Sequence, residues 1–136
     1  KVYCYPFVAS SASCWLPLEV HYPDTPGYGL ASAEKLYEGS STVYLPAMPL
    51  DGLSAQMFSP PTHVKIDVEG HEFYVLNGMQ GLLGDGTIKS VIVEIVDNNA
   101  ETQIEKLMER HGYYGEEAED SRRTEENRTL IYEQAN

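Results

Sequence analysis

The 136-residue chain is short of basic residues, cysteine and long apolar segments. Nine Lys and Arg stand against 21 Asp and Glu, and the formal net charge of -12 would repel both a nucleic-acid backbone and an anionic membrane surface. No apolar run reaches the ~20 residues that span a bilayer, and no secretory signal pattern opens the chain. We therefore expect a cytoplasmic protein that binds neither nucleic acid nor membrane.

The two cysteines, Cys4 and Cys14, allow at most one disulfide and lack the CxxC spacing of zinc and redox motifs. Because free cysteine usually packs as a small apolar side chain, we expect both to be buried. The sequence also lacks an initiator methionine and opens on a strand-like apolar run at residues 2–9. This start predicts a truncated gene or an expressed fragment.

Hydrophobic patterning divides the chain, read as one domain over residues 1–136, into two parts. Residues 1–60 form a β-rich segment, with strands expected at 2–9, 15–22 and 42–50 and a helical turn at 31–37. Residues 61–136 form a βαβα core followed by terminal strands. Their expected elements are strands at 63–68 and 90–96, helices at 72–84 and 100–111, short strands at 112–114 and 129–132, and a charged loop at 116–127. Strand and helix alternating over short connections predict a parallel sheet.

Acidic side chains end both strands of this core. Asp67 and Glu69 close the first strand, and Glu94 and Asp97 close the second. Neighbouring parallel strands bring their carboxyl ends to one edge of the sheet, where ligands of open α/β folds gather. A carboxylate within an apolar strand, such as Asp67 or Glu94, needs a partner, so both are candidates for a functional role.

Each polar residue near these strand ends also has a structural interpretation. Glu69 and Glu72 could complement the positive end of the following helix, and a lone histidine at a helix start, here His71, is often exposed and idle. His71 is alternatively suited to act as a general base. The carboxylates and His71 are chemically suited to a divalent metal, but no ligand spacing such as HExxH is present.

A set of short motifs resembles the FkbM-type methyltransferases. The central one is KIDVEGHE at residues 65–72, followed by VLNG at 75–78, VIVEI at 91–95 and GY at 112–113. LDGL precedes them at residues 50–53, and residues 5–11 are similar to a segment that follows a strand in the family. The resemblance covers roughly residues 2–114, and the ordered spacing of its motifs makes it fairly specific.

The resemblance implies a Rossmann-like fold and methyl transfer from S-adenosylmethionine, commonly to a hydroxyl oxygen of a small molecule or sugar. It implies catalytic roles for four residues at the strand ends, Asp67, Glu69, His71 and Glu94. It implies cofactor contacts for Ser10, Ser11 and Asp67. Which carboxylate acts as the base, and which molecule accepts the methyl group, are not determined by these motifs.

The sequence also departs from the family. The glycine-rich turn and the acidic residue that hold the methionine and ribose of the cofactor in the family are not found in it. We therefore expect a partial Rossmann-like fold, a mixed, mostly parallel sheet with flanking helices that lacks the first two strands, and no activity from the chain alone. Exposed strand edges seek partners, so the opening strand should re-pair within the chain, or the chain should form a homodimer through a sheet edge.

Two other functions stay open at this point. The chain is alternatively a non-catalytic remnant or oligomerising module in which the acidic strand ends have lost their role. The third alternative is a metal-dependent enzyme that uses the four polar residues of the strand ends, Asp67, Glu69, His71 and Glu94.

Overall fold

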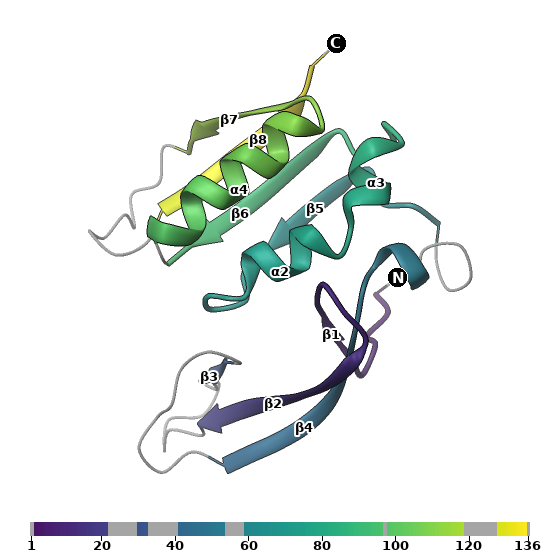
Figure 1. Ribbon diagram of the computed structural model, residues 1–136, viewed down its shortest axis with the longest axis vertical. Coiled ribbons are helices and arrows are strands. Elements are labelled where there is room, and N and C mark those ends of the chain that lie inside the picture. Colours follow the sequence, from purple (N-terminus) through teal and green to yellow (C-terminus); the bar gives the residue numbers. More distant parts are fainter. Residues whose placement is uncertain are drawn as a thin grey trace.

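The computed structural model describes residues 2–21, 30–32, 41–53, 59–96, 98–118 and 128–135, which form two four-stranded sheets (Figure 1). The first, the hairpin sheet, has the strand order β1-β4-β2-β3. Its strands are β1 (Val8–Ala9), β2 (Cys14–His21), β3 (Leu30–Ser32) and β4 (Ser41–Met48). β2 and β4 pair antiparallel along almost their whole length, from Cys14 opposite Ala47 to Val20 opposite Ser41.

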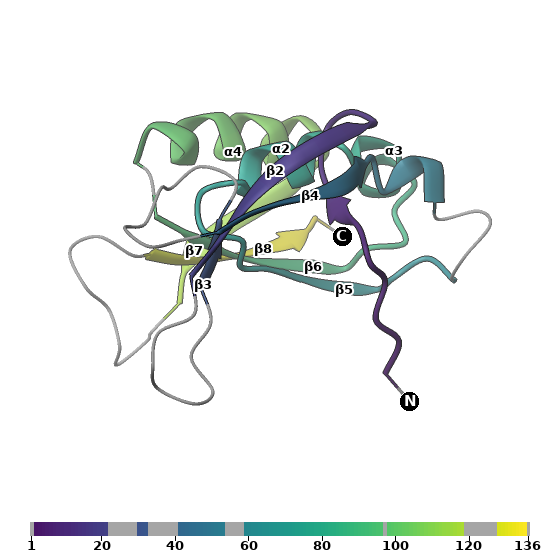
Figure 2. The same cartoon turned by 90° about the horizontal axis from the view of Figure 1, so that it is seen from below.

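The second sheet is covered by helices and has the strand order β5-β6-β8-β7. Its strands are β5 (His63–Ile66), β6 (Ser90–Ile95), β7 (Tyr113–Glu117) and β8 (Arg128–Gln134). The helices are α2 (Glu72–Asn77), α3 (Gln80–Gly84) and α4 (Asn98–Arg110). All three lie on the same face of this helix-covered sheet (Figure 2).

The α/β class is confirmed, but the expectation of a mostly parallel sheet is wrong. Each sheet contains one parallel pair, β1 with β4 and β5 with β6, and its other two pairs are antiparallel. In the helix-covered sheet, the cause is β8, which inserts between β6 and β7 and runs opposite to both. In the hairpin sheet, β2 runs opposite to both of its neighbours.

Most predicted elements are present, with shifted bounds. The predicted strand at 2–9 is reduced to β1, and the predicted helical turn at 31–37 is wrong at residues 31–32, which belong to β3. The rest of that turn, and most of the predicted charged loop at 116–127, lie outside the described residues. The single helix predicted for residues 72–84 is two helices, α2 and α3, separated at Gly78 and Met79.

The core lies between the helix-covered sheet and its helices. In β6 the buried residues alternate with half-buried ones, because successive side chains of a strand point to opposite faces. α4 turns a helical stripe of apolar side chains toward the same core. The buried residues contributed by these two elements are Val91, Val93, Ile95, Ile104, Leu107 and Met108. The longest described helix, α4, is too short and too polar to cross a membrane, and none of the described helices is long and apolar enough to do so.

The prediction of buried cysteines is wrong. Cys4 and Cys14 are both free and exposed. Cys4 lies in the exposed segment before β1, and Cys14 begins β2, whose first residues are exposed on both faces of the strand. The general tendency of free cysteine to be buried does not hold in this part of the chain, because nearly all the buried core residues lie in the helix-covered sheet and its helices.

The predicted re-pairing of the opening segment has a counterpart in β1. Val8 pairs with Ala47 and Ala9 with Met48, both in parallel register. At the other sheet, β5 has one neighbour, β6, among the described strands and is therefore an edge strand of that part of the chain. Whether this edge mediates a homodimer stays a prediction.

Two residues, Gly78 and Asp51, fix the junction between α2, α3 and the hairpin sheet. A Cβ added at Gly78 would overlap with the backbone carbonyl of Ser10, so this glycine permits a close approach of two backbones. The carboxylate of Asp51 accepts hydrogen bonds from the N–H groups of Gly81 at 2.8 Å and Leu82 at 2.9 Å. Asp51 therefore caps the start of α3 from a distant part of the chain.

Gly78→Ala should destabilise the fold by about 3 kcal/mol, because the added methyl meets backbone atoms that cannot rotate away. Urea unfolding followed by circular dichroism measures this free energy. Gly52→Ala is the matched control, since its Cβ would meet nothing within 4 Å, and it should change stability by less than about 1 kcal/mol. Equal effects of the two substitutions would contradict the close approach at Gly78.

Candidate functional site

A strained turn follows β5 and directs the chain into α2. Glu69 has φ 54 and Gly70 has φ 101, so two successive residues adopt left-handed conformations. Such a φ is unfavourable for a residue with a Cβ and often marks a functional site. The N–H of Gly70 donates to the carboxylate oxygen Oε1 of Glu72 at 2.9 Å, which ties the turn to the first residue of the helix.

Asp67 directly follows β5, two residues before Glu69, and is partly open to solvent. Its carboxylate oxygen Oδ2 lies 2.7 Å from Nζ of Lys65, two residues earlier on the same side of the strand. Both side chains are exposed by 42% or more, so this ion pair adds little to stability. It orients the carboxylate at the carboxyl end of β5.

His71 is buried, with 5% of its surface exposed, which contradicts the view of an exposed, idle histidine. Its ring stacks on Tyr74 with the ring centroids 4.7 Å apart. Its Nε2 shares a hydrogen bond of 3.1 Å with Oγ of Ser10, which is itself buried. The bond joins residues 61 positions apart and connects α2 to the hairpin sheet.

A pocket of about 310 Å³ lies where these elements meet. The end of β5 and the start of α2 contribute Asp67, Val68 and His71. The hairpin sheet and the segment before it contribute an apolar wall that consists of Phe7, Val8, Ala9, Leu18 and Leu45. The pocket therefore pairs a carboxylate and an imidazole on one side with hydrocarbon on the other.

The structure brings some of the predicted site residues together and leaves others apart. Asp67 and His71 line one pocket, whereas Glu69 lies in the adjoining turn and Glu94 is half-buried near the end of β6. The parallel register of β5 and β6, in which Ile66 pairs with Val93, confirms that both strands end at the same edge. Asp97 lies outside the described residues.

Ser10 and Ser11, which were predicted to contact the cofactor, are not among the residues that line the pocket. Ser10 uses its hydroxyl for His71 and donates its backbone N–H to the carbonyl of Met48 at 3.1 Å. Ser11 is half-buried in the bend after it. Ser10 thus positions the imidazole, and cofactor contact by either serine stays a prediction.

Sequence reasoning missed the apolar wall and the burial of Glu72. The wall residues Phe7, Leu18 and Leu45 read as ordinary strand residues, and no local pattern shows that they face the end of β5. Glu72 is 1% exposed, and its Oε2 has no hydrogen-bond partner among the described residues. The signal for Glu72 was its place three and four residues before Val75 and Leu76, which puts it on the buried face of α2.

Metal binding is not supported by the described geometry. Within the part of the chain that the structure describes, no three His, Cys, Asp or Glu side chains lie close enough to hold a metal ion. The pocket contains two side chains that could bind a metal ion, Asp67 after β5 and His71 before α2. The metal-dependent alternative therefore has no site among these residues.

Comparison with protein families decides the ancestry of this arrangement. The model of the methyltransferase FkbM domain matches residues 14–114, which is most of the chain. The chain belongs to the FkbM methyltransferase family. Neither a search of curated proteins nor a search of solved structures returned a significant match. Ligands of open α/β folds bind beyond the carboxyl ends of the strands, and the pocket at Asp67 lies at the carboxyl end of β5.

The FkbM family implies S-adenosylmethionine as methyl donor, and the described residues do not fit this whole cofactor. Its adenine, ribose diol and amino-acid group need several hydrogen-bonding partners, but the pocket offers only Asp67 and His71 beside an apolar wall. The glycine-rich turn and the acidic residue that the resemblance to the family assigns to these groups are not found in the sequence.

Ser10→Ala should cost about 1–3 kcal/mol of stability, because it leaves the buried Nε2 of His71 without its hydrogen-bond partner. Thermal and urea unfolding measure the loss. Ser13→Ala, at an exposed position of the same segment, is the control and should change stability by less than about 0.5 kcal/mol. An equally small effect at Ser10 would show that its bond to His71 does not hold the hairpin sheet in place.

Proposed function

We propose that this FkbM-family chain forms the acceptor side of an O-methyltransferase centre and holds the hydroxyl of a small molecule or sugar. The observation that carries the proposal is the pocket in which Asp67 and His71, at the end of β5, face the apolar wall of the hairpin sheet. Hydrocarbon lining with a few converging polar groups is the usual composition of a small-molecule site.

Within this site, Asp67 is the proposed partner of the acceptor hydroxyl. An oxygen that accepts a methyl group loses its proton, and a carboxylate within hydrogen-bond reach can take it. Asp67 lines the pocket and is partly exposed, whereas Nε2 of His71 is already bonded to Ser10. The proton would therefore move from the hydroxyl to Oδ of Asp67, while the fixed imidazole shapes the pocket floor and restricts the pose of the acceptor.

Glu69 and Glu94 have supporting roles in this proposal. Neither lines the pocket. Glu69 shapes the left-handed turn that separates Asp67 from His71, and Glu94 adds negative charge near the same sheet edge. Groups that hold S-adenosylmethionine are not supplied by the described residues, so the chain alone should be inactive.

The edge of β5 supports a second, oligomerising role. An edge strand presents unpaired backbone groups that can pair with another strand, and β5 has a single described neighbour. We propose that a homodimer forms through this edge. Sedimentation of the wild type and of Val64→Pro, which places a proline in β5, tests it: a dimer that becomes a folded monomer supports the proposal, and a wild-type monomer at high micromolar concentration contradicts it.

The acceptor site can be tested with benzyl alcohol and benzyl methyl ether, which differ by one methyl group. Methyl-detected NMR should show both perturbing Val8, Leu18 and Leu45, and the alcohol should bind about tenfold more tightly because it donates to the Asp67 carboxylate. Asp67→Asn should reduce this preference, and Glu94→Gln, outside the pocket, should keep it. Perturbations elsewhere, or equal affinities in the wild type, would contradict the proposal.

Calorimetric titration tests the cofactor separately. S-adenosylmethionine should show no binding tighter than about 1 mM to the chain alone, because the described pocket lacks partners for its ribose and amino-acid groups. Micromolar binding, lost in Asp67→Asn, would show instead that this chain completes a cofactor site by itself. Mn²⁺ and Zn²⁺ serve as controls for the metal-dependent alternative.

A further inference from the structure

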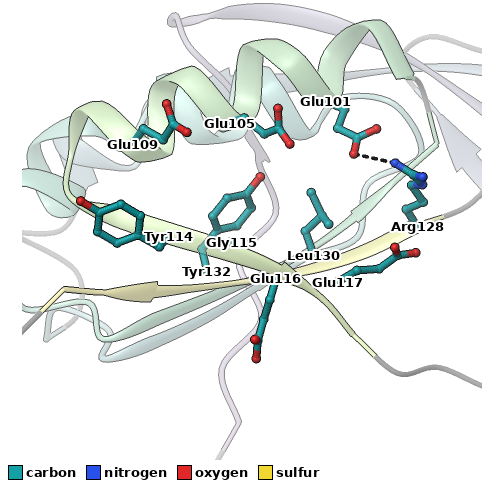
Figure 3. A pocket seen from close by; sticks show the side chains of 10 residues that line it. All are labelled: Glu101, Glu105, Glu109, Tyr114, Gly115, Glu116, Glu117, Arg128, Leu130 and Tyr132. Carbon is teal, nitrogen blue, oxygen red and sulfur yellow. Dashed lines mark hydrogen bonds and ion pairs between the residues drawn. The ribbon is translucent and has the colours of Figure 1, made fainter.

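A second cavity lies at the edge of the helix-covered sheet that is remote from β5. It is a groove of about 340 Å³ between α4 and the strands β7 and β8 (Figure 3). It shares no lining residue with the pocket at Asp67. The methyltransferase site therefore does not account for it.

Carboxylates line the helical side of this groove at regular intervals. Glu101, Glu105 and Glu109 each lie four residues apart, so they occupy one face of α4 and turn toward the strands (Figure 3). Four residues of helix rise about 6 Å, which sets the spacing of the three groups. Oε1 of Glu101 lies 2.9 Å from Nη1 of Arg128, so one of the carboxylates is neutralised. The side chains of Glu105 and Glu109 have no ion pair in the described part of the chain.

An unpartnered hydroxyl lies opposite the carboxylates. Tyr132 on β8 is 2% exposed and directs its hydroxyl toward α4, close to Glu105 (Figure 3). Among the described residues this hydroxyl has no hydrogen-bond partner. Burial raises the pKa of Tyr132, and Glu105 raises it further. The phenol therefore stays protonated at neutral pH and can both donate and accept a hydrogen bond.

The groove floor is built to keep the tyrosine in this position. Gly115 lies directly opposite Tyr132 in the β7–β8 register, and a Cβ there would overlap with the tyrosine ring. Leu130, two residues before Tyr132, adds an apolar surface on the same side of β8. The floor at Leu130 and Tyr132 is thus aliphatic and aromatic, the helical wall is anionic, and β7 adds Glu116 and Glu117 to the lining.

We propose that this groove binds a linear aliphatic polyamine. Ammonium groups separated by short methylene chains match carboxylates that recur about every 6 Å along a helix. The methylene groups would pack on Leu130 and the ring of Tyr132, and one ammonium would donate to the unpartnered hydroxyl and lie near the aromatic ring. A single metal ion fits less well, since no three carboxylates among the described residues converge on one point.

The proposal is tested by titrating the intact chain with spermidine, followed by calorimetry and thermal shift at constant ionic strength. We expect saturable one-site binding that exceeds that of butylamine, which has one charge. Glu105→Gln combined with Glu109→Gln should weaken spermidine binding at least about tenfold, because two ion pairs are lost. Tyr132→Phe should weaken it about tenfold, since a hydrogen bond from a charged ammonium donor is lost.

Glu133→Gln is the matched control. Glu133 is exposed, adjoins Tyr132 on β8 and points to the opposite face of the strand, so the substitution removes the same charge outside the groove. Spermidine affinity should then stay within about twofold. If Glu133→Gln weakens binding as much as the double substitution, or if Mg²⁺ at equal ionic strength displaces spermidine, the binding reflects net charge alone and the proposal is wrong. Absence of saturable binding also overturns it.

Tyr132→Phe also supplies a check on folding. Because the hydroxyl is buried without a partner, its removal should leave the melting temperature of the free chain unchanged or raised. In the wild type, spermidine should raise the melting temperature more than in Tyr132→Phe, since a ligand that binds only the native state stabilises it. A large loss of stability in Tyr132→Phe without spermidine would show that the hydroxyl has a structural partner and would remove the basis of the proposal.

Discussion

The close contact between Ser10 and the two ends of α2 is the constraint on which the site depends. At this point two backbones approach over Gly78, and the hydroxyl of Ser10 holds the buried ring of His71. The contact seats the hairpin sheet against the end of β5, and the apolar wall of the pocket exists only because of that placement. A hairpin held elsewhere would leave Asp67 at an open strand end facing water.

The family motifs serve the backbone more than the chemistry. In KIDVEGHE, the Glu69–Gly70 pair makes a left-handed turn and Glu72 is buried against it. Asp51 of the LDGL motif caps α3. Gly78 of VLNG has no Cβ and therefore allows the backbone of Ser10 to approach closely. Asp67, Val68 and His71 are the members of these motifs that line the pocket, and Asp67 and His71 are the polar ones. Much of what makes these motifs recognisable is therefore the backbone geometry that brings two polar side chains to the pocket.

Local patterns predicted the elements well and their assembly less well. β5, β6 and α4 were found from apolar runs and helical periodicity, because their buried faces are set by the residues themselves. The order β5-β6-β8-β7, the division into two sheets and the exposure of Cys4 and Cys14 depend on contacts between distant segments, which no local pattern encodes. The site followed the same rule: Asp67 and His71 were visible as strand-end polar residues, whereas Leu18 and Leu45 became part of it only through the hairpin sheet.

The position of β8 in its sheet has a consequence for how the chain is made. β8 lies between β6 and β7, although both precede it in the sequence. While the protein is synthesised, β7 can pair with β8, its one neighbour among the described strands, only after residues 128–134 have left the ribosome. The sheet therefore closes only after translation has passed this strand, and until then the nascent chain exposes the facing edges of β6 and β7 to other proteins in the cell.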